Sequence, residues 1–280
     1  SSATREQIEE LPEYVQNTNI TVQHIEQGHV FDLEIHVYYE QEHASVRIVD
    51  THTNIVQIEK NWQVIFEDKT TSLELKADHS ALIMKQIWDF SQTVDIDDVK
   101  EILDRQITCN MAIANEGIHN SYGANIGHVI LNMDSDCVKT RAKAYAAAGS
   151  DARMNGCELP VVINSGSGNQ GITCCVPVVV YAKELDCTQE QLYRALVLSN
   201  LTAIYIKTGI GTLSAFCGAV SAGAAAGAGI AYLHNGTYKE IQHTIVNALA
   251  ILSGTICDGA KASCAAKIAS SIDAGIMGYY

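Results

Sequence analysis

Two cysteines near the end of the chain, Cys257 and Cys264, enclose a short segment that contains Gly259. In one straight helix, positions seven residues apart would lie about 10 Å apart along the axis, too far for easy sharing of one metal centre. Gly259 offers a break, so a helix ending near Cys257 and a new one starting near Ser263 would bring the sulfurs together. Spacing alone leaves two interpretations open, metal binding and two small buried cysteines, because neither a C-x2-C motif nor a matching His pair is present.

A third cysteine, Cys217, precedes a run of Gly, Ala and Ser residues that reaches Gly227. By itself Cys217 reads as a core residue, because free cysteines are among the most buried side chains. The small residues after it allow close approach, either of another helix or of a ligand. The remaining cysteines show no ligand spacing and are interpreted as structural.

A run of small and amide residues separates the apolar segments 160–163 and 172–181. It consists of Asn164, Ser165, Gly166, Ser167, Gly168, Asn169, Gln170 and Gly171. It is not a Walker phosphate loop, because no Gly-Lys-Ser/Thr follows. Its glycines free several backbone N–H groups to point at a ligand, and a following helix N-terminus would favour a carboxylate. We interpret residues 164–169 as a substrate-binding loop; the alternative is an ordinary tight loop.

Three side chains could carry a proton. His52 stands at the start of an expected strand, and Glu116 and His119 lie in a Gly/Asn-rich hinge between helices. Each has an alternative without chemistry: a surface histidine for His52, and a capped helix–helix turn for Glu116 and His119.

Composition narrows the class of protein. Hydrophobic residues make up 47% of the 280 positions and charged residues 18%, which is typical of a globular chain. The net charge of −14, without a basic stripe, argues against nucleic acid and anionic membrane as partners. The nine cysteines sit in a chain too long for a disulfide scaffold, and the polar N-terminus shows no secretory signal, so we expect a cytoplasmic protein.

The uncharged stretch 208–235 must be weighed as a membrane span. It contains few of the large apolar residues that drive insertion, so a buried helix with closely approaching neighbours is favoured. The same helix could also pair two copies of the chain as a homodimer.

The pattern of hydrophobic residues predicts an α+β protein. Alternation at period two over residues 19–68 indicates a small antiparallel sheet, which follows a short polar helix at 6–16. Helical spacing dominates after Thr71, so we expect a sheet-bearing part at 1–75 and a larger all-helical domain at 76–280. The predicted helices are 83–90, 96–116, 129–148, 189–205, 213–233, 238–256 and 263–276, with caps at Asp95 and Thr188.

Three short segments of the chain resemble sequences of a known family. Residues 164–173, 149–154 and 253–264 are similar to signature segments of the iron-sulfur L-cysteine desulfidases, which are similar to the alpha chains of bacterial iron-sulfur L-serine dehydratases. The resemblance extends from about Thr21 to the end of the chain, with a shorter and weaker match at 52–56.

The resemblance implies a 4Fe-4S cluster held by Cys217, Cys257 and Cys264, with one iron left open to polarise the substrate. It further implies β-elimination of L-cysteine: a base removes the α-proton, sulfide leaves, and the aminoacrylate hydrolyses to pyruvate and ammonia. L-Serine would react in the same way and release water. The alternatives are L-serine dehydratase activity, a non-catalytic amino-acid-binding or redox-sensing iron-sulfur module, and a zinc protein.

The chain also departs from the family pattern. Members carry an N-terminal Gly-Cys-Thr-Glu-Pro segment that is absent here, and they continue beyond the position at which this chain stops. We therefore expect a fragment that holds the cluster ligands without being a complete catalyst.

Overall fold

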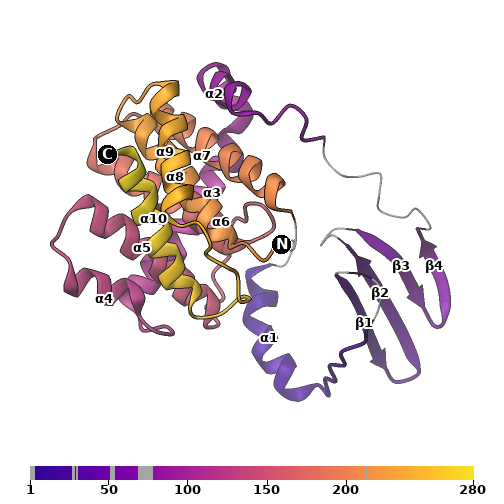
Figure 1. Ribbon diagram of the computed structural model, residues 1–280. Helices are drawn as coiled ribbons and strands as arrows, with labels where there is room; N and C mark the ends of the chain where they lie inside the picture. The colour runs from indigo at the N-terminus through magenta and orange to yellow at the C-terminus, as the bar shows by residue number, and fades with distance from the viewer. Residues whose placement is uncertain (1–3, 27–28, 30, 51–53, 69–77, 212–213) are drawn as a thin grey trace. The chain divides into compact units, whose positions relative to one another are not determined.

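The computed structural model describes residues 4–26, 29, 31–50, 54–68, 78–211 and 214–280. The chain divides into two compact units, Ser1–Ala77 and Asp78–Tyr280 (Figure 1). The predicted α+β class is confirmed, because an antiparallel sheet is followed by a series of helices.

The first unit contains one helix and a sheet. Helix α1 (Arg5–Asn17) begins with a capping box between Thr4 and Gln7. The strands are β1 (Asp32–Tyr39), β2 (Glu42–Val49), β3 (Ile55–Lys60) and β4 (Gln63–Glu67). They pair antiparallel in the order β1-β2-β3-β4, as expected for consecutive segments of alternating hydrophobicity.

The second unit is helical. Its helices are α2 (Met84–Thr93), α3 (Ile96–His119), α4 (Ile126–Met133), α5 (Val138–Met154), α6 (Gly168–Glu184), α7 (Gln189–Ile210), α8 (Gly218–Leu233), α9 (Tyr238–Ile251) and α10 (Cys264–Tyr279). The predicted caps are present: the Asp95 side chain accepts from the Asp97 amide, and Thr188 forms a capping box with Gln191.

Helix α8 is the centre of this unit, in contact with α6, α7, α9 and α10 (Figure 1). Its Gly- and Ala-rich sequence lets backbones approach closely: a Cβ built on Gly275 of α10 would stand 2.4 Å from the carbonyl oxygen of Gly223. The predicted buried helix is therefore confirmed. No helix formed by the described residues is long and apolar enough to cross a membrane.

Several predicted helix limits are wrong; α5 and α7, for example, end at Met154 and Ile210 rather than at 148 and 205. The single helix expected over 129–148 is two helices, because the polar residues 134–137 favour a turn and the carboxylates of Asp134 and Asp136 pair with Lys143 and Arg141 of α5. Helix α8 begins five residues later than the predicted start at 213, and α9 ends at Ile251 rather than 256. In both cases tertiary pairing draws the backbone out of the helix, as the bridge between Phe216 and Ile256 shows.

Candidate functional site

The residues before α8 and those after α9 pair with each other. The Cys217 amide donates to the Thr255 carbonyl at 3.2 Å, and the Cys257 amide donates to the Ala215 carbonyl at 2.7 Å. Cys217 is the N-cap residue of α8, and Gly259 has a positive φ of 95°, which ends the extended stretch. The predicted break between Cys257 and Cys264 is thus confirmed, and two of the three cysteines lie on neighbouring extended segments.

Cys264 joins this region as the first residue of α10. One turn later, the Lys267 ammonium donates to the Ile256 carbonyl at 3.3 Å and pairs with the Asp258 carboxylate. That carboxylate raises the pKa of Lys267, and the nearby thiols of Cys217 and Cys264 raise it further. Lys267 therefore ties the Cys257 loop to α10 and marks the place where the cysteines gather, here called the cysteine end.

The predicted substrate loop begins with a two-residue turn. Asn164 and Ser167 exchange backbone hydrogen bonds of 3.2 and 3.0 Å, and the residues between them, Ser165 and Gly166, both have positive φ angles, 50° and 81°. These values correspond to a type I′ turn, in which Gly is favoured and Ser is strained.

Buried amides hold this turn in place. Asn164 donates from its side chain to the Asn200 side chain at 2.9 Å, and Asn200 in turn exchanges hydrogen bonds with Gln106. Asn110 of α3 exchanges two hydrogen bonds with the backbone of Val162, which lies two residues before Asn164. These bonds fix the segment that leads into the turn. The described hydrogen bonds of Asn164 therefore hold the turn in place. The supporting amides, Gln106 and Asn110 of α3 and Asn200 of α7, could not be recognised from the sequence, because no local motif marks them.

Arg153, at the end of α5, supplies a cation beside the loop. Its guanidinium donates to the Asn169 side chain at 3.2 Å, and a Cβ built on Gly168 would stand 2.4 Å from Arg153 Nε. Gly168 is the first residue of α6. Ser167 is the N-cap residue of that helix, and its side chain makes no capping hydrogen bond. A guanidinium and a helix N-terminus at one place form a site that favours a carboxylate. Sequence reasoning noticed the segment 149–154 but missed this role of Arg153.

Gln170 connects the loop to the cysteine end. It lies in the first turn of α6, and its side-chain nitrogen is 3.5 Å from the Ser165 carbonyl oxygen. The same amide lies against Gly218, where a built Cβ would be 2.7 Å from Gln170 Cδ. Since Gly218 follows Cys217 directly, the substrate loop and a predicted cluster ligand lie next to each other.

The predicted proton carriers have mainly local partners. Glu116 accepts from Tyr122 and from Asn120, each at 2.9 Å, and the bond to Glu116 is the main reason why the pKa of Tyr122 rises to about 12. His119 Nδ1 is 2.7 Å from the carbonyl oxygen of Asn115. His52 lies outside the described residues.

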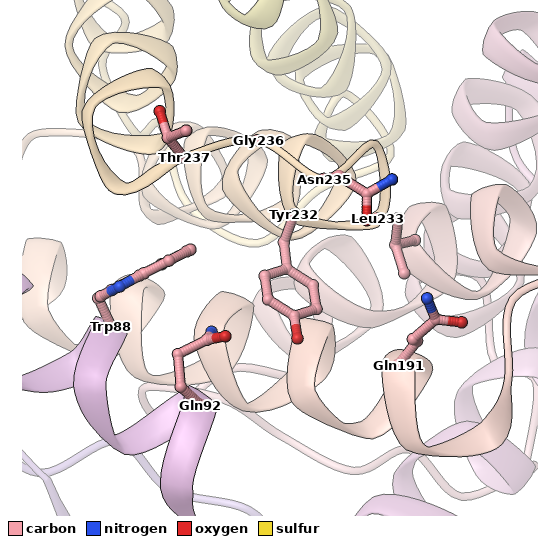
Figure 2. A pocket seen from close by; sticks show the side chains of 8 residues that line it. All are labelled: Trp88, Gln92, Gln191, Tyr232, Leu233, Asn235, Gly236 and Thr237. Carbon is pink, nitrogen blue, oxygen red and sulfur yellow. The ribbon is translucent and has the colours of Figure 1, made fainter.

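A cavity of about 340 Å³ lies elsewhere in the helical unit (Figure 2). Trp88 and Gln92 of α2, Gln191 of α7 and the α8–α9 turn surround it, with the Tyr232 ring in the middle (Figure 2). Tyr232 is 15 residues along α8 from Cys217, or about 22 Å at 1.5 Å per residue. The cavity is therefore separate from the cysteine end and the loop, where the predicted chemistry gathers.

Comparison with known proteins decides the family. The model of the serine dehydratase alpha chain matches residues 13–280. The chain belongs to the serine dehydratase alpha chain family. The match includes the loop, the three cysteines and Arg153. No solved structure matches the chain.

Similar proteins carry the name UPF0597, which states no activity. A UPF0597 protein of Desulfitobacterium hafniense is 54% identical over 97% of the chain and 64% of its own length. Another, from Lachnoclostridium phytofermentans, is 56% identical over 83% of the chain and 56% of its own length. A third, from Finegoldia magna, is 48% identical over the whole chain and 67% of its own length. The chain therefore spans about two thirds or less of these relatives.

The serine dehydratase family implies an iron-sulfur cluster, and the donor chemistry of the cysteine end fits one. Each of the nine cysteines is a free thiol, and Cys217 and Cys264 lie at helix N-termini, which favour bound negative charge. Among the described residues no three His, Cys, Asp or Glu side chains converge as they would around one metal ion.

Proposed function

We propose that the full-length protein is an iron-sulfur-dependent lyase that converts L-cysteine to pyruvate, ammonia and sulfide. The observation that carries the proposal is the contact between Gln170 and Gly218, because it brings a carboxylate-favouring loop beside a cysteine predicted to bind the cluster. A carboxylate site and a thiolate-rich site at one place suit a small amino acid with a reactive β-substituent.

The loop and Arg153 would bind the substrate carboxylate. Arg153 offers a planar fork of donors, and the N–H groups at the start of α6 add a second set. The turn at Ser165 and Gly166 is fixed by the Asn164–Asn200 bond, so these donors are in place before the substrate arrives.

Cys217, Cys257 and Cys264 would hold the cluster, and Lys267 would offset part of its negative charge. When bound, the cluster supplies a Lewis-acidic iron for the substrate carboxylate and leaving group. Lys267 also fixes the Cys257 loop through Ile256 and Asp258, so the three thiols would keep their relative positions.

Elimination requires a base for the α-proton, and His119 is one candidate. Its Nδ1 faces a carbonyl oxygen, which only accepts, so the neutral ring carries its proton on Nδ1 and leaves Nε2 free to accept. Glu116 and His52 remain the other candidates. The α-proton goes to the base and sulfide leaves from Cβ, after which water adds to the imine form of aminoacrylate and releases ammonia.

The test is an anaerobic assay of the reconstituted full-length protein with L-cysteine and L-serine side by side. Pyruvate and sulfide in equal amounts, with higher kcat/KM for L-cysteine, would support the proposal. Pyruvate formed faster from L-serine would identify an L-serine dehydratase instead. Amino-acid binding without pyruvate would identify a non-catalytic binding or redox-sensing module.

A further inference from the structure

Gln170 has a buried acceptor that the fold does not use. The residue is 6% exposed, and its Oε1 has no hydrogen-bond partner among the described residues. Its Nε2 donates to the Ser165 carbonyl oxygen in a long hydrogen bond of 3.5 Å, and because that oxygen can only accept, this contact favours the amide orientation with nitrogen toward the loop. A buried polar atom without a partner is rare in folded proteins and calls for a ligand or a functional explanation.

We infer that Gln170 Oε1 accepts a hydrogen bond from the α-ammonium group of the substrate. The inference deepens the proposed function and rests on it, because it assumes that the ligand is an amino acid. A carbonyl oxygen can be satisfied only by a donor, and an ammonium group brings three N–H donors and a charge. The neutral amide provides this contact without the cost of burying a carboxylate.

Gly218 makes room for this arrangement. A Cβ at this position would stand 2.7, 2.8 and 2.9 Å from Cδ, Nε2 and Oε1 of Gln170, so any larger residue would displace the whole amide. Gln170 can therefore lie beside the residue that follows Cys217. An ammonium group bound there would place the rest of the amino acid between the loop and the cysteine end.

Arg153 and Gln170 then divide the recognition of an amino acid. Both flank the start of α6: Arg153 contacts Gly168 and Asn169, and Gln170 is the next residue. The guanidinium suits the carboxylate and the amide oxygen suits the ammonium, so an amino acid matches both groups. A ligand without its amino group would leave Oε1 unpaired, which is how such sites reject analogues.

The experiment compares two probes that undergo no elimination, L-alanine and propionate, by calorimetric titration of the full-length protein. Propionate lacks only the amino group. We expect Gln170→Leu to weaken L-alanine binding by about tenfold to hundredfold, the range for a hydrogen bond to a charged group, and to leave propionate binding unchanged.

Controls separate recognition from folding. Gln92→Leu changes a glutamine at the distant cavity and should leave both affinities unchanged. Equal weakening of both probes by Gln170→Leu, or no binding of L-alanine by the unaltered protein, would overturn the inference. Gln170-dependent binding without pyruvate formation would sink the proposed lyase activity but leave the inference standing. Pyruvate formation together with L-alanine binding that does not change in Gln170→Leu would support the lyase activity and overturn the inference about Gln170.

Discussion

The amide nitrogen of Cys217 lies 3.2 Å from the carbonyl oxygen of Thr255 and donates a hydrogen bond to it. This bond joins the start of α8 to the segment after α9, two places 38 residues apart in the sequence. It explains why cysteines with no shared local motif gather at one end of the helical unit. The proposed cluster depends on this pairing, because the pairing brings Cys217 and Cys257 onto neighbouring segments.

Each of Cys217→Ser, Cys257→Ser and Cys264→Ser should abolish cluster binding by the full-length protein. After anaerobic reconstitution the unaltered protein should be brown and hold about four iron atoms per chain, whereas each variant should hold less than about one. Serine is a poor ligand for this cluster, because the irons bind thiolates. The measurement is the visible absorption spectrum together with iron and acid-labile sulfide content.

Cys137→Ser is the matched control, because Cys137 is an exposed free thiol outside the cysteine end. It should keep its colour and iron. Colourless unaltered protein, or a Cys137→Ser variant as pale as the others, would contradict the assignment.

Gly275→Ala should destabilise the helical unit by about 1–3 kcal/mol, the usual cost of overfilling a packed interior. A Cβ on Gly275 would stand 2.4 Å from the carbonyl oxygen of Gly223 and 3.2 Å from the nitrogen of Gly227, and backbone atoms cannot move aside cheaply. The measurement is urea unfolding followed by circular dichroism at 222 nm, the helical signal.

Gly209→Ala is the companion variant. Gly209 lies inside α7, and a Cβ there meets nothing within 4 Å. Alanine should therefore raise the free energy of unfolding by up to about 1 kcal/mol through helix propensity. Similar effects of the two substitutions would show that α8 and α10 do not approach as closely as described.

Asp151→Asn should change how stability depends on pH. Burial raises the pKa of Asp151, while the hydrogen bonds from the Ile126 and Ala124 amides oppose that rise. A carboxyl with a raised folded-state pKa stabilises most below its unfolded pKa, and this contribution is lost as the pH rises through the folded pKa. Asparagine does not ionise and can still accept from Ile126, so the variant should gain stability relative to the unaltered protein as the pH rises above about 4, the ordinary pKa of an unfolded Asp.

Asp151→Ala separates ionisation from capping. The Asp151 carboxylate accepts from the Ile126 amide at 2.7 Å and thus caps α4 from the neighbouring helix. Alanine removes that acceptor and should lower the free energy of unfolding by about 1–2 kcal/mol at pH 7. Thermal unfolding across the pH range measures both variants. Parallel pH profiles for Asp151→Asn and the unaltered protein would count against the argument.

Local patterns predicted much of the fold. Period-two alternation identified the sheet, and caps such as Thr188 with Gln191 located helix starts, because these features depend on residues a few positions apart. Helix limits failed where a distant segment competes for the backbone, as at Phe216 and Ile256. A single-sequence pattern carries no information about such partners.

The sequence by itself determined the α+β class, the glycine loop and the break at Gly259, since each follows from the conformational preferences of neighbouring residues. Only the tertiary structure decided that Arg153 lies against Gly168 and that Gln170 lies against Gly218. Those contacts arise because helices with small residues approach closely enough to bring distant side chains together. In the sequence, Gln170 cannot be distinguished from the other polar residues of the loop. Its unpaired side-chain oxygen can be recognised only in the folded chain.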